Sequence, residues 1–242
     1  SFSCNTYKIN FFQEFDFSKY DIIHSHMLRP DAYIWYHRKK IKTICVSTIH
    51  QNIKENLKYS YNGLISYIFS RLWFKFLKSQ SKIVVLSKVM KNEYEKLLKT
   101  KEIYPIYNGR TINVESEIDS KDEFLIQKLS KSYKIIGTVA NITNTKGIDQ
   151  IIKYLTVNPE YALIVIGEGK NKIDLINLAK KSNIVERCLF LGYRINGYRY
   201  IKYFDIYAMP SRAEGFGLAL IEASQYYKPI LCSNIEIFRE LY

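Results

Sequence analysis

The stretch Glu214-Gly-Phe-Gly-Leu-Ala-Leu-Ile-Glu222 sets two carboxylates around a glycine-flanked turn that leads into a helix. It follows Tyr203-Phe-Asp-Ile-Tyr-Ala-Met209, an apolar run that predicts a buried strand ending at Pro210. Residues 217–224 are apolar or small except for Glu222, so the helix is predicted to be largely buried. A lone carboxylate on a buried helix costs several kcal/mol unless it is paired. The stretch therefore predicts a polar site at the end of a buried strand.

The groups around this turn match the parts of a nucleotide-sugar. Glycines at 215 and 217 let a ligand approach the backbone closely, and a helix start attracts phosphate. Glu214 repels phosphate, so its expected partner is a sugar hydroxyl, whereas Glu222 leans back toward the same helix end and can accept both hydroxyls of a ribose. The alternative for either residue alone is a helix-cap glutamate or a buried ion pair. The residues expected to offer backbone contacts are Gly215, Phe216, Gly217 and Leu218.

This stretch resembles the signature of the retaining glycosyltransferases of the GT-B fold, specifically the large family four. The resemblance covers most of the chain, and the order and spacing of its motifs make it specific. The other similar segments are Asp21-Ile-Ile-His-Ser-His26, Ser47-Thr-Ile-His50, Ile83-Val-Val-Leu-Ser87, Pro105-Ile-Tyr-Asn-Gly109, Ile136-Gly-Thr-Val-Ala140 with Lys146-Gly147, and Phe190-Leu-Gly-Tyr-Arg194. Members of that family are longer at both ends, so the resemblance implies an internal fragment.

Strand-like runs alternate with helical stretches along the chain, and this pattern predicts an α/β fold with doubly wound parallel sheets. A polar stretch, residues 111–131, separates two such blocks. We predict two Rossmann-like domains, residues 1–109 on the acceptor side and residues 110–242 on the nucleotide-sugar side, each incomplete at its outer end. Ligands of such sheets bind beyond the carboxyl ends of the strands, and all the motifs quoted above fall there.

The resemblance assigns roles on the nucleotide-sugar side. Lys146 would stabilise charge on the leaving diphosphate. The family usually has an arginine five residues earlier, where this chain has Asn141, a neutral donor instead of a bidentate cation. Arg212 and the missing amino-terminal loop are the candidate replacements. Gly167 would bring backbone near the diphosphate or ribose, and Arg194 would border the nucleobase. A solvated surface lysine and a plain turn are the alternatives for Lys146 and Gly167.

The resemblance also brings His50 to the donor sugar or the reacting centre, although a lone histidine after a strand is more often structural. We expect His24 and His26, on either side of Ser25, to face opposite ways, which disfavours a shared metal site. Cysteines and histidines do not cluster in the sequence, so we predict no metal and no cofactor. The predicted catalytic residues are His50, Lys146 and Glu214.

The net charge of +13 is distributed unevenly. Residues 1–109 hold eighteen Lys and Arg against eight Asp and Glu, whereas the remainder holds eighteen against fifteen. A basic amino-terminal half favours a polyanionic partner such as anionic lipid, a lipid pyrophosphate or nucleic acid. Residues 59–78 are rich in aromatic and basic side chains at helical spacing, so they fit either a membrane interface or a helix packed on the sheet. Four widely spaced cysteines indicate reduced thiols in a cytosolic protein.

We therefore predict a metal-independent retaining glycosyltransferase of hexosyl type that uses a nucleotide-sugar donor and a glycan or lipid-linked acceptor in cell-surface polysaccharide assembly. It is expected in the cytoplasm or on the cytoplasmic face of a membrane, with no nucleic-acid partner. Two alternatives stay open. A nucleotide-sugar epimerase on the same fold would need acid and base carboxylates in the amino-terminal half, where acidic residues are few. A non-enzymatic basic binding module would leave Glu214 and Glu222 without a purpose.

Overall fold

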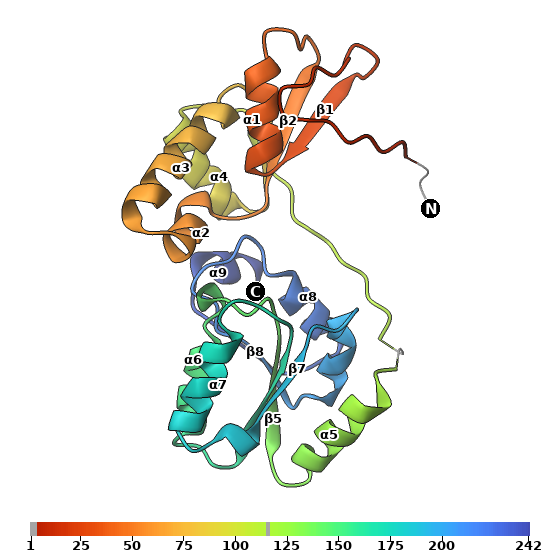
Figure 1. The fold of residues 1–242 in the computed structure, drawn as a ribbon, viewed down its shortest axis with the longest axis vertical. Helices are drawn as coiled ribbons and strands as arrows, with labels where there is room; N and C mark the ends of the chain where they lie inside the picture. The colour runs from red at the N-terminus through yellow and green to blue at the C-terminus, as the bar shows by residue number, and fades with distance from the viewer. Residues whose placement is uncertain (1–3, 115–116) are drawn as a thin grey trace. The chain divides into compact units, whose positions relative to one another are not determined.

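The computed structural model describes residues 4–114 and 117–242, and the chain divides into two compact units, residues 1–107 and 108–242. The division falls two residues before Gly109, where the predicted boundary lies. Each unit contains a parallel sheet with helices packed on it (Figure 1). The predicted fold class, two parallel-sheet α/β units, is confirmed.

Unit 1, residues 1–107, has a four-stranded sheet in the order β1-β2-β3-β4, and every neighbouring pair is parallel. Its elements are β1 (Ile22–His26), α1 (Leu28–His37), β2 (Ile44–Ile49), α2 (Ile53–Ser60), α3 (Gly63–Leu77), β3 (Lys82–Val85), α4 (Lys88–Leu98) and β4 (Ile103–Pro105).

Three helices of unit 1 begin at side-chain caps that are readable in the sequence. The side chains of Asn52, Asn62 and Ser87 accept the backbone N–H three residues further on, at 3.1, 3.0 and 3.0 Å. Such caps satisfy one of the free donors at a helix start. The cap at Asn62 also explains why residues 59–78 do not form one helix, because α2 ends at Ser60 and α3 begins anew at Gly63.

Unit 2, residues 108–242, has a five-stranded parallel sheet in the order β7-β6-β5-β8-β9. Its elements are α5 (Ser120–Ser130), β5 (Lys134–Val139), η1 (Asn144–Lys146), α6 (Ile148–Leu155), β6 (Tyr161–Ile166), α7 (Lys172–Lys181), η2 (Val185–Arg187), β7 (Cys188–Gly192), η3 (Gly197–Tyr203), β8 (Ile206–Met209), α8 (Leu218–Gln225), β9 (Ile230–Cys232) and α9 (Glu236–Leu241). The chain moves outward from β5 to β7 and then crosses to β8 on the other side of β5. The order therefore reverses between β5 and β8, and ligands of doubly wound sheets bind at this switch point.

The central strands of unit 2 are buried on both faces. Ile135 and Ile164 belong to one apolar cluster with residues of α5, η3, α8 and α9. Their neighbours Ile136 and Leu163 belong to a second cluster with residues of α6 and α7. Figure 1 shows α6 and α7 on one side of this sheet and α5 and α8 on the other. Burial on both faces explains why these strands read as continuous apolar runs and not as alternating ones.

Candidate functional site

The loops that follow β5 and β8 meet closely at the switch point of unit 2. Gly147 has a φ of 65°, and a Cβ added there would lie 2.0 Å from the carbonyl oxygen of Pro210. Only glycine combines this backbone conformation with such a close approach. The Arg212 N–H donates to the Thr145 carbonyl at 2.7 Å, and the Gln150 amide donates to the Pro210 carbonyl at 2.9 Å. The two loops are therefore held in register.

Arg212 strengthens the same junction with its side chain. Its guanidinium donates to both carboxylate oxygens of Asp149, at 2.9 and 2.8 Å, and to the Asn144 carbonyl at 2.6 Å. Hydrogen bonds from Arg212 hold the pKa of Asp149 below its ordinary value. A bidentate pair of this kind fixes geometry as well as charge. Arg212 is thus committed to the loops, and the structure does not place it as the replacement for the missing arginine at Asn141.

The junction brings two of the predicted catalytic residues into direct contact. Lys146 Nζ lies 2.5 Å from Glu214 Oε1, and their side chains are 25% and 10% exposed. The Ser211 hydroxyl donates to the same carboxylate oxygen at 2.7 Å. Sequence reasoning expected Glu214 to face a sugar hydroxyl and did not find Ser211, although its position three residues before Glu214 in the turn was a usable signal. In this structure Glu214 holds an ammonium and a hydroxyl at once.

Glu222 lies in the second turn of α8 and is 6% exposed. The Nε of Arg110 lies 2.7 Å from its carboxylate, so the buried Glu222 is paired with an arginine whose side chain is 41% exposed. Burial raises the pKa of Glu222, and Arg110 opposes that shift. Tyr207 on β8 is fully buried, which raises its pKa, and the carboxylates of Glu222 and Glu214 raise it further. Both glutamates therefore act on one buried tyrosine.

The turn between these two glutamates is itself buried at Gly215, Phe216 and Gly217, and Leu218 opens helix α8. The sequence did not indicate the partner of Glu222, because Arg110 lies 112 residues earlier in the chain. The side-chain amide of Gln225, one turn after Glu222, donates to the Arg110 carbonyl at 3.0 Å. Helix α8 therefore holds Arg110 at two points.

A pocket of about 390 Å³ lies at the ends of β5, β6 and β7. It brings together three of the predicted donor-binding residues, Asn141, Gly167 and Arg194. Gly167 has a φ of 139°, and a Cβ there would lie 1.9 Å from the Ala140 carbonyl oxygen, so the strand ends pack through it. The other lining residues are Val139, Ala140, Ile166, Glu168, Tyr193 and Gly197.

Arg194 borders this pocket, and its guanidinium is paired with a carboxylate of helix α5. Its Nε and a terminal nitrogen donate to the two carboxylate oxygens of Asp122 on α5, at 2.6 and 2.9 Å. Tyr200 also donates to Asp122, at 2.5 Å. Burial raises the pKa of Asp122, but the hydrogen bonds from Arg194 and Tyr200 outweigh it and leave the pKa lowered. Burial, followed by Asp122, raises the pKa of Tyr200 to about 12. Sequence reasoning missed Asp122.

In unit 1 the structure corrects one expectation about the histidines. His24 and His26 lie on the same face of β1, with ring centroids 4.3 Å apart, while Ser25 between them is buried. The expectation of opposite faces was wrong because strand side chains alternate, so residues two apart share a face. His50 follows β2, and its Nε2 lies 2.7 Å from Nδ1 of His26. Within residues 4–114 and 117–242, no group of three or more His, Cys, Asp or Glu is arranged to hold a metal ion.

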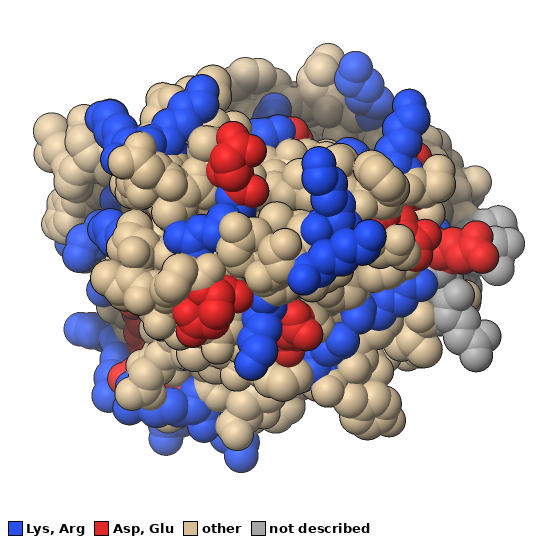
Figure 2. All heavy atoms as spheres, turned by 90° about the horizontal axis from the view of Figure 1, so that it is seen from below, with Lys and Arg blue, Asp and Glu red and all other residues tan. Residues whose placement is uncertain are grey.

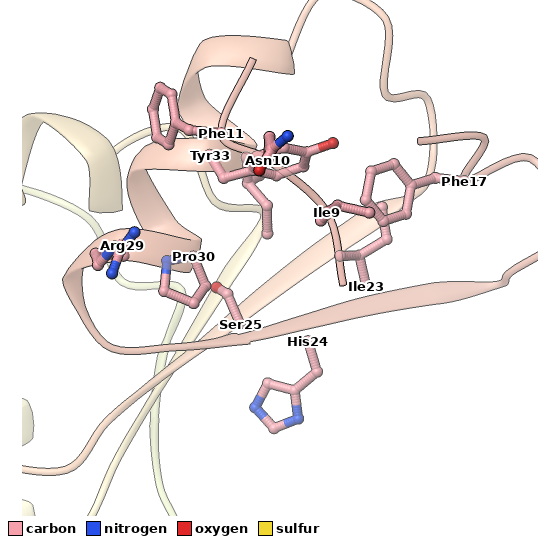
Figure 3. A pocket seen from close by; sticks show the side chains of 11 residues that line it. Ile9, Asn10, Phe11, Phe17, Ile23, His24, Ser25, Arg29, Pro30 and Tyr33 are labelled. Atoms are coloured by element: carbon pink, nitrogen blue, oxygen red, sulfur yellow. The ribbon is translucent and has the colours of Figure 1, made fainter. Parts of the chain in front are cut away.

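Unit 1 also contains a pocket of about 270 Å³ between its amino-terminal segment, β1 and α1 (Figure 3). Its lining is mostly apolar, and the ring of His24 points away from it (Figure 3). The lining residues are Ile9, Asn10, Phe11, Phe17, Ile23, His24, Ser25, Arg29, Pro30, Tyr33 and Ile34. Every helix in the described part of the chain is too short or too polar to span a bilayer.

Comparison with known sequences agrees with this geometry in both units. Residues 119–242 match the family Glycosyl transferases group 1, and residues 7–113 match Glycosyltransferase Family 4. The chain belongs to the glycosyl transferases group 1 family. The matched range 119–242 includes the residues of the switch point, the pocket and α8. The predicted resemblance to this family is confirmed.

Individual members of the family extend the comparison. The chain is 34% identical over 235 residues to an O-antigen biosynthesis glycosyltransferase, WclY, of Escherichia coli. The aligned region covers 93% of this chain and 64% of that protein. It is 29% identical over 122 residues to an E. coli UDP-Gal:alpha-D-GlcNAc-diphosphoundecaprenol alpha-1,3-galactosyltransferase, which covers 48% of this chain and 32% of that protein. The crystal structure of Anabaena HepE in complex with UDP-glucose superposes with a TM-score of 0.77 at 20% identity, over 93% of this chain and 62% of that one. This last likeness shows the fold, and the chain spans less than two thirds of the length of these relatives.

Proposed function

We propose that the full-length protein is a retaining glycosyltransferase that moves a sugar from a nucleotide-sugar to a glycan or lipid-linked acceptor in polysaccharide assembly. The observation that carries this proposal is the contact between Lys146 and Glu214 at the switch point of unit 2. One residue offers a cation for a diphosphate and the other an acceptor for a sugar hydroxyl, and Ser211 shows that the carboxylate already accepts from a hydroxyl.

The chemistry needs no covalent attachment to the protein. The bond between the anomeric carbon and the diphosphate oxygen breaks, and the acceptor oxygen bonds to the same face of the sugar. The proton of the acceptor hydroxyl passes to the departing diphosphate, so the products are a glycoside and a nucleoside diphosphate. Lys146 stabilises the charge that develops on the diphosphate, which is the interaction that accelerates such a step. Asn141 adds one neutral donor. The ribose hydroxyls take the place of Arg110 as the partners of Glu222 and donate hydrogen bonds to its carboxylate.

A panel of nucleotide-sugars tests the proposal on the full-length protein, with release of nucleoside diphosphate as the readout. UDP-sugars are the first to try, because HepE forms a complex with UDP-glucose and one E. coli relative is a UDP-Gal galactosyltransferase. Activity should persist in EDTA, since Lys146 supplies the charge. Glu214→Gln should lower turnover more than it lowers donor affinity. The matched control is Glu102→Gln, which removes a carboxylate from an exposed pair with Lys82 in unit 1 and should leave turnover unchanged.

Two other outcomes would redirect the assignment. If no donor in the panel releases nucleoside diphosphate, with or without glycan and lipid-linked acceptors, the transferase assignment is contradicted. Conversion of one nucleotide-sugar into its epimer, with the diphosphate still attached, would favour the epimerase.

A second part of the proposal concerns attachment to an anionic membrane surface through α3. Two faces of this helix differ sharply. Trp73 and Leu77 are buried, and the Trp73 indole donates to Asp31 at 2.8 Å, so Trp73 is not available to lipid. The opposite face exposes apolar side chains that are 37–71% accessible. They are Leu64, Ile65, Tyr67, Ile68, Phe69 and Leu72.

Basic residues border this apolar face. The Arg71 guanidinium lies 5.6 Å from the Tyr67 ring centroid, and Lys75 lies 4.8 Å from the ring centroid of Trp35. A helix with exposed apolar side chains beside Lys and Arg fits the interface of an anionic bilayer, and each basic residue near such a surface contributes about 1 kcal/mol. The face drawn in Figure 2 differs from this pattern, because acidic side chains are interspersed among the basic ones there.

Flotation with vesicles that contain about one third phosphatidylserine tests the attachment. The protein should float at low salt and release as the salt concentration rises, because surface charges are screened. Arg71→Glu with Lys75→Glu should abolish flotation while leaving donor binding intact. The matched control, Lys180→Glu with Lys181→Glu at the end of α7, makes the same charge change on another helix and should still float. An intact protein that stays at the bottom of the gradient would end this part of the proposal.

A further inference from the structure

Three of the four histidines of the chain gather at the carboxyl ends of β1 and β2. The strands are parallel, and His26 is the register partner of Thr48. Alternation of side chains then places His24, His26, Thr48 and His50 on one face. The contacts follow from this placement, because His24 Nε2 lies 2.7 Å from Thr48 Oγ1 and His26 Nδ1 lies 2.7 Å from His50 Nε2. The rings of His26 and His50 are stacked, with centroids 5.0 Å apart.

The opposite face of the same two strands is locked by a buried carboxylate. Asp31 on α1 has no exposed surface and accepts hydrogen bonds from Ser25 at 2.6 Å, Ser47 at 2.8 Å and Trp73 at 2.8 Å. Ser25 lies between His24 and His26, and Ser47 precedes Thr48. Because Ser25 and Ser47 are both hydrogen-bonded to Asp31, the strand backbone that carries the histidines is held in place. A cluster built in this way is pre-organised.

A hydrogen bond between two imidazoles has a chemical consequence. One nitrogen must carry the proton and the other must offer a lone pair, so at least one of the two rings is neutral. The contact uses Nε2 of His50 and thereby restricts the orientation of the ring. Among the hydrogen bonds of the described residues, His50 takes part through Nε2 alone. Nδ1 of His50 is therefore the nitrogen available to a substrate hydroxyl.

We propose that His26 is a positioning residue for His50, which it holds in one orientation and one tautomer so that His50 Nδ1 meets a hydroxyl of the sugar or the acceptor. This inference rests on the proposed transferase function. It assigns a role to the first histidine motif of the chain, which sequence reasoning left without one. It also explains why a second imidazole lies directly beside His50 at this edge of the sheet.

The groups around the pair set its response to pH. Burial, followed by His26, lowers the pKa of His50, and burial, followed by His26 and His50, lowers that of His24. Asp31 on α1 lies on the opposite face of the strands and interacts with His26 through its charge. Protonation of both rings breaks the His26–His50 hydrogen bond, since each nitrogen then donates. Without His26 one cause of the lowered pKa of His50 is lost, so the acid side of the pH–rate profile should move to higher pH.

Side-chain mimicry gives a sharp test in the full-length protein. The amide of asparagine can occupy the place of Nδ1 of a histidine, whereas that of glutamine reaches the place of Nε2. His26→Phe and His26→Gln should lower kcat roughly 10-fold, by analogy with the lower end of the range for losing the partner that orients a metal-bound histidine, with the donor KM unchanged. His26→Asn should restore most of the rate. His37→Gln, which keeps a donor for the Phe11 carbonyl at the Nε2 position, is the control and should leave kcat unchanged.

Nitrogen-15 NMR of the histidine-labelled full chain provides a readout that does not depend on activity. His50 should show a single tautomer in the wild type and in His26→Asn, and a tautomer mixture in His26→Phe. Equal rates for the phenylalanine, glutamine and asparagine variants, or one unchanged His50 tautomer in all of them, would overturn the inference. A wild-type chain that releases no nucleoside diphosphate would refute the proposed function, and the spectra would still decide whether His26 orients His50.

Discussion

Replacing Lys146 by alanine separates the chemical role of its ammonium from its structural role. In the structure Lys146 Nζ is 2.5 Å from Glu214 Oε1, and both side chains are mostly buried. The substitution removes the cation proposed for the diphosphate and leaves Glu214 with Ser211 as its remaining hydrogen-bond partner at this oxygen. The rate and the fold should therefore both respond, by amounts that can be worked out separately.

The rate effect follows from the scale for removing one preorganised group from an active site, about 2–4 kcal/mol. That energy corresponds to a fall in kcat of roughly 30- to 900-fold. The stability effect follows from the loss of a hydrogen bond to a charged group, about 1.5–3 kcal/mol. In a protein of this size such a loss lowers the melting temperature by roughly 3–12 °C.

Steady-state release of nucleoside diphosphate at saturating donor, together with thermal unfolding, measures the two effects. Lys146→Ala with Glu214→Gln supplies the decisive comparison, because it removes the uncompensated carboxylate charge. This double variant should regain much of the lost stability while its kcat stays low. If Lys146→Ala keeps a rate within about threefold of wild type and only the melting temperature falls, Lys146 is a structural partner of Glu214 and the diphosphate is bound elsewhere.

Three further predictions concern unit 2. Glu222→Gln should weaken nucleoside diphosphate binding about 10-fold by calorimetry, an effect of about 1.4 kcal/mol, because an amide replaces one acceptor oxygen by a donor; an unchanged Kd would remove Glu222 from the ribose. Asn141→Arg should be neutral or activating in the transfer assay, since it restores a bidentate cation beside the pocket, and a large loss of kcat would show that the site is built around the amide. The pKa of Asp122 is lowered, so its contribution to stability is present above the unfolded-state pKa of about 4 and is lost as the pH falls through the lower folded-state value. Urea unfolding should accordingly show a steeper acid loss of stability in the wild type than in Asp122→Asn, and parallel curves would contradict the role of the Arg194 pair.

Much of the fold was predictable because local patterns specify it. The apolar runs at residues 134–140 and 162–166 predicted buried parallel strands, and the structure places both in the centre of a sheet with two covered faces. The glycine turn and the two glutamates marked the start of α8 for the same reason, since glycine content and isolated carboxylates are visible in the sequence. The error over His24 and His26 came from misapplying the two-residue period of a strand and not from missing information.

The partners of the site residues were decided only by tertiary structure. The sequence around Glu222 does not indicate its partner Arg110, and the sequence around Arg194 does not indicate Asp122. Each pair joins segments at least 72 residues apart. The same holds for the exposed face of α3, where helical spacing gives an apolar stripe but packing of Trp73 against Asp31 decides which side is covered. Residue types and their spacing along the chain therefore determined the strands, the helices and the chemical groups at their ends. The order of strands, which brings the loops after β5 and β8 together, determined which of those groups meet.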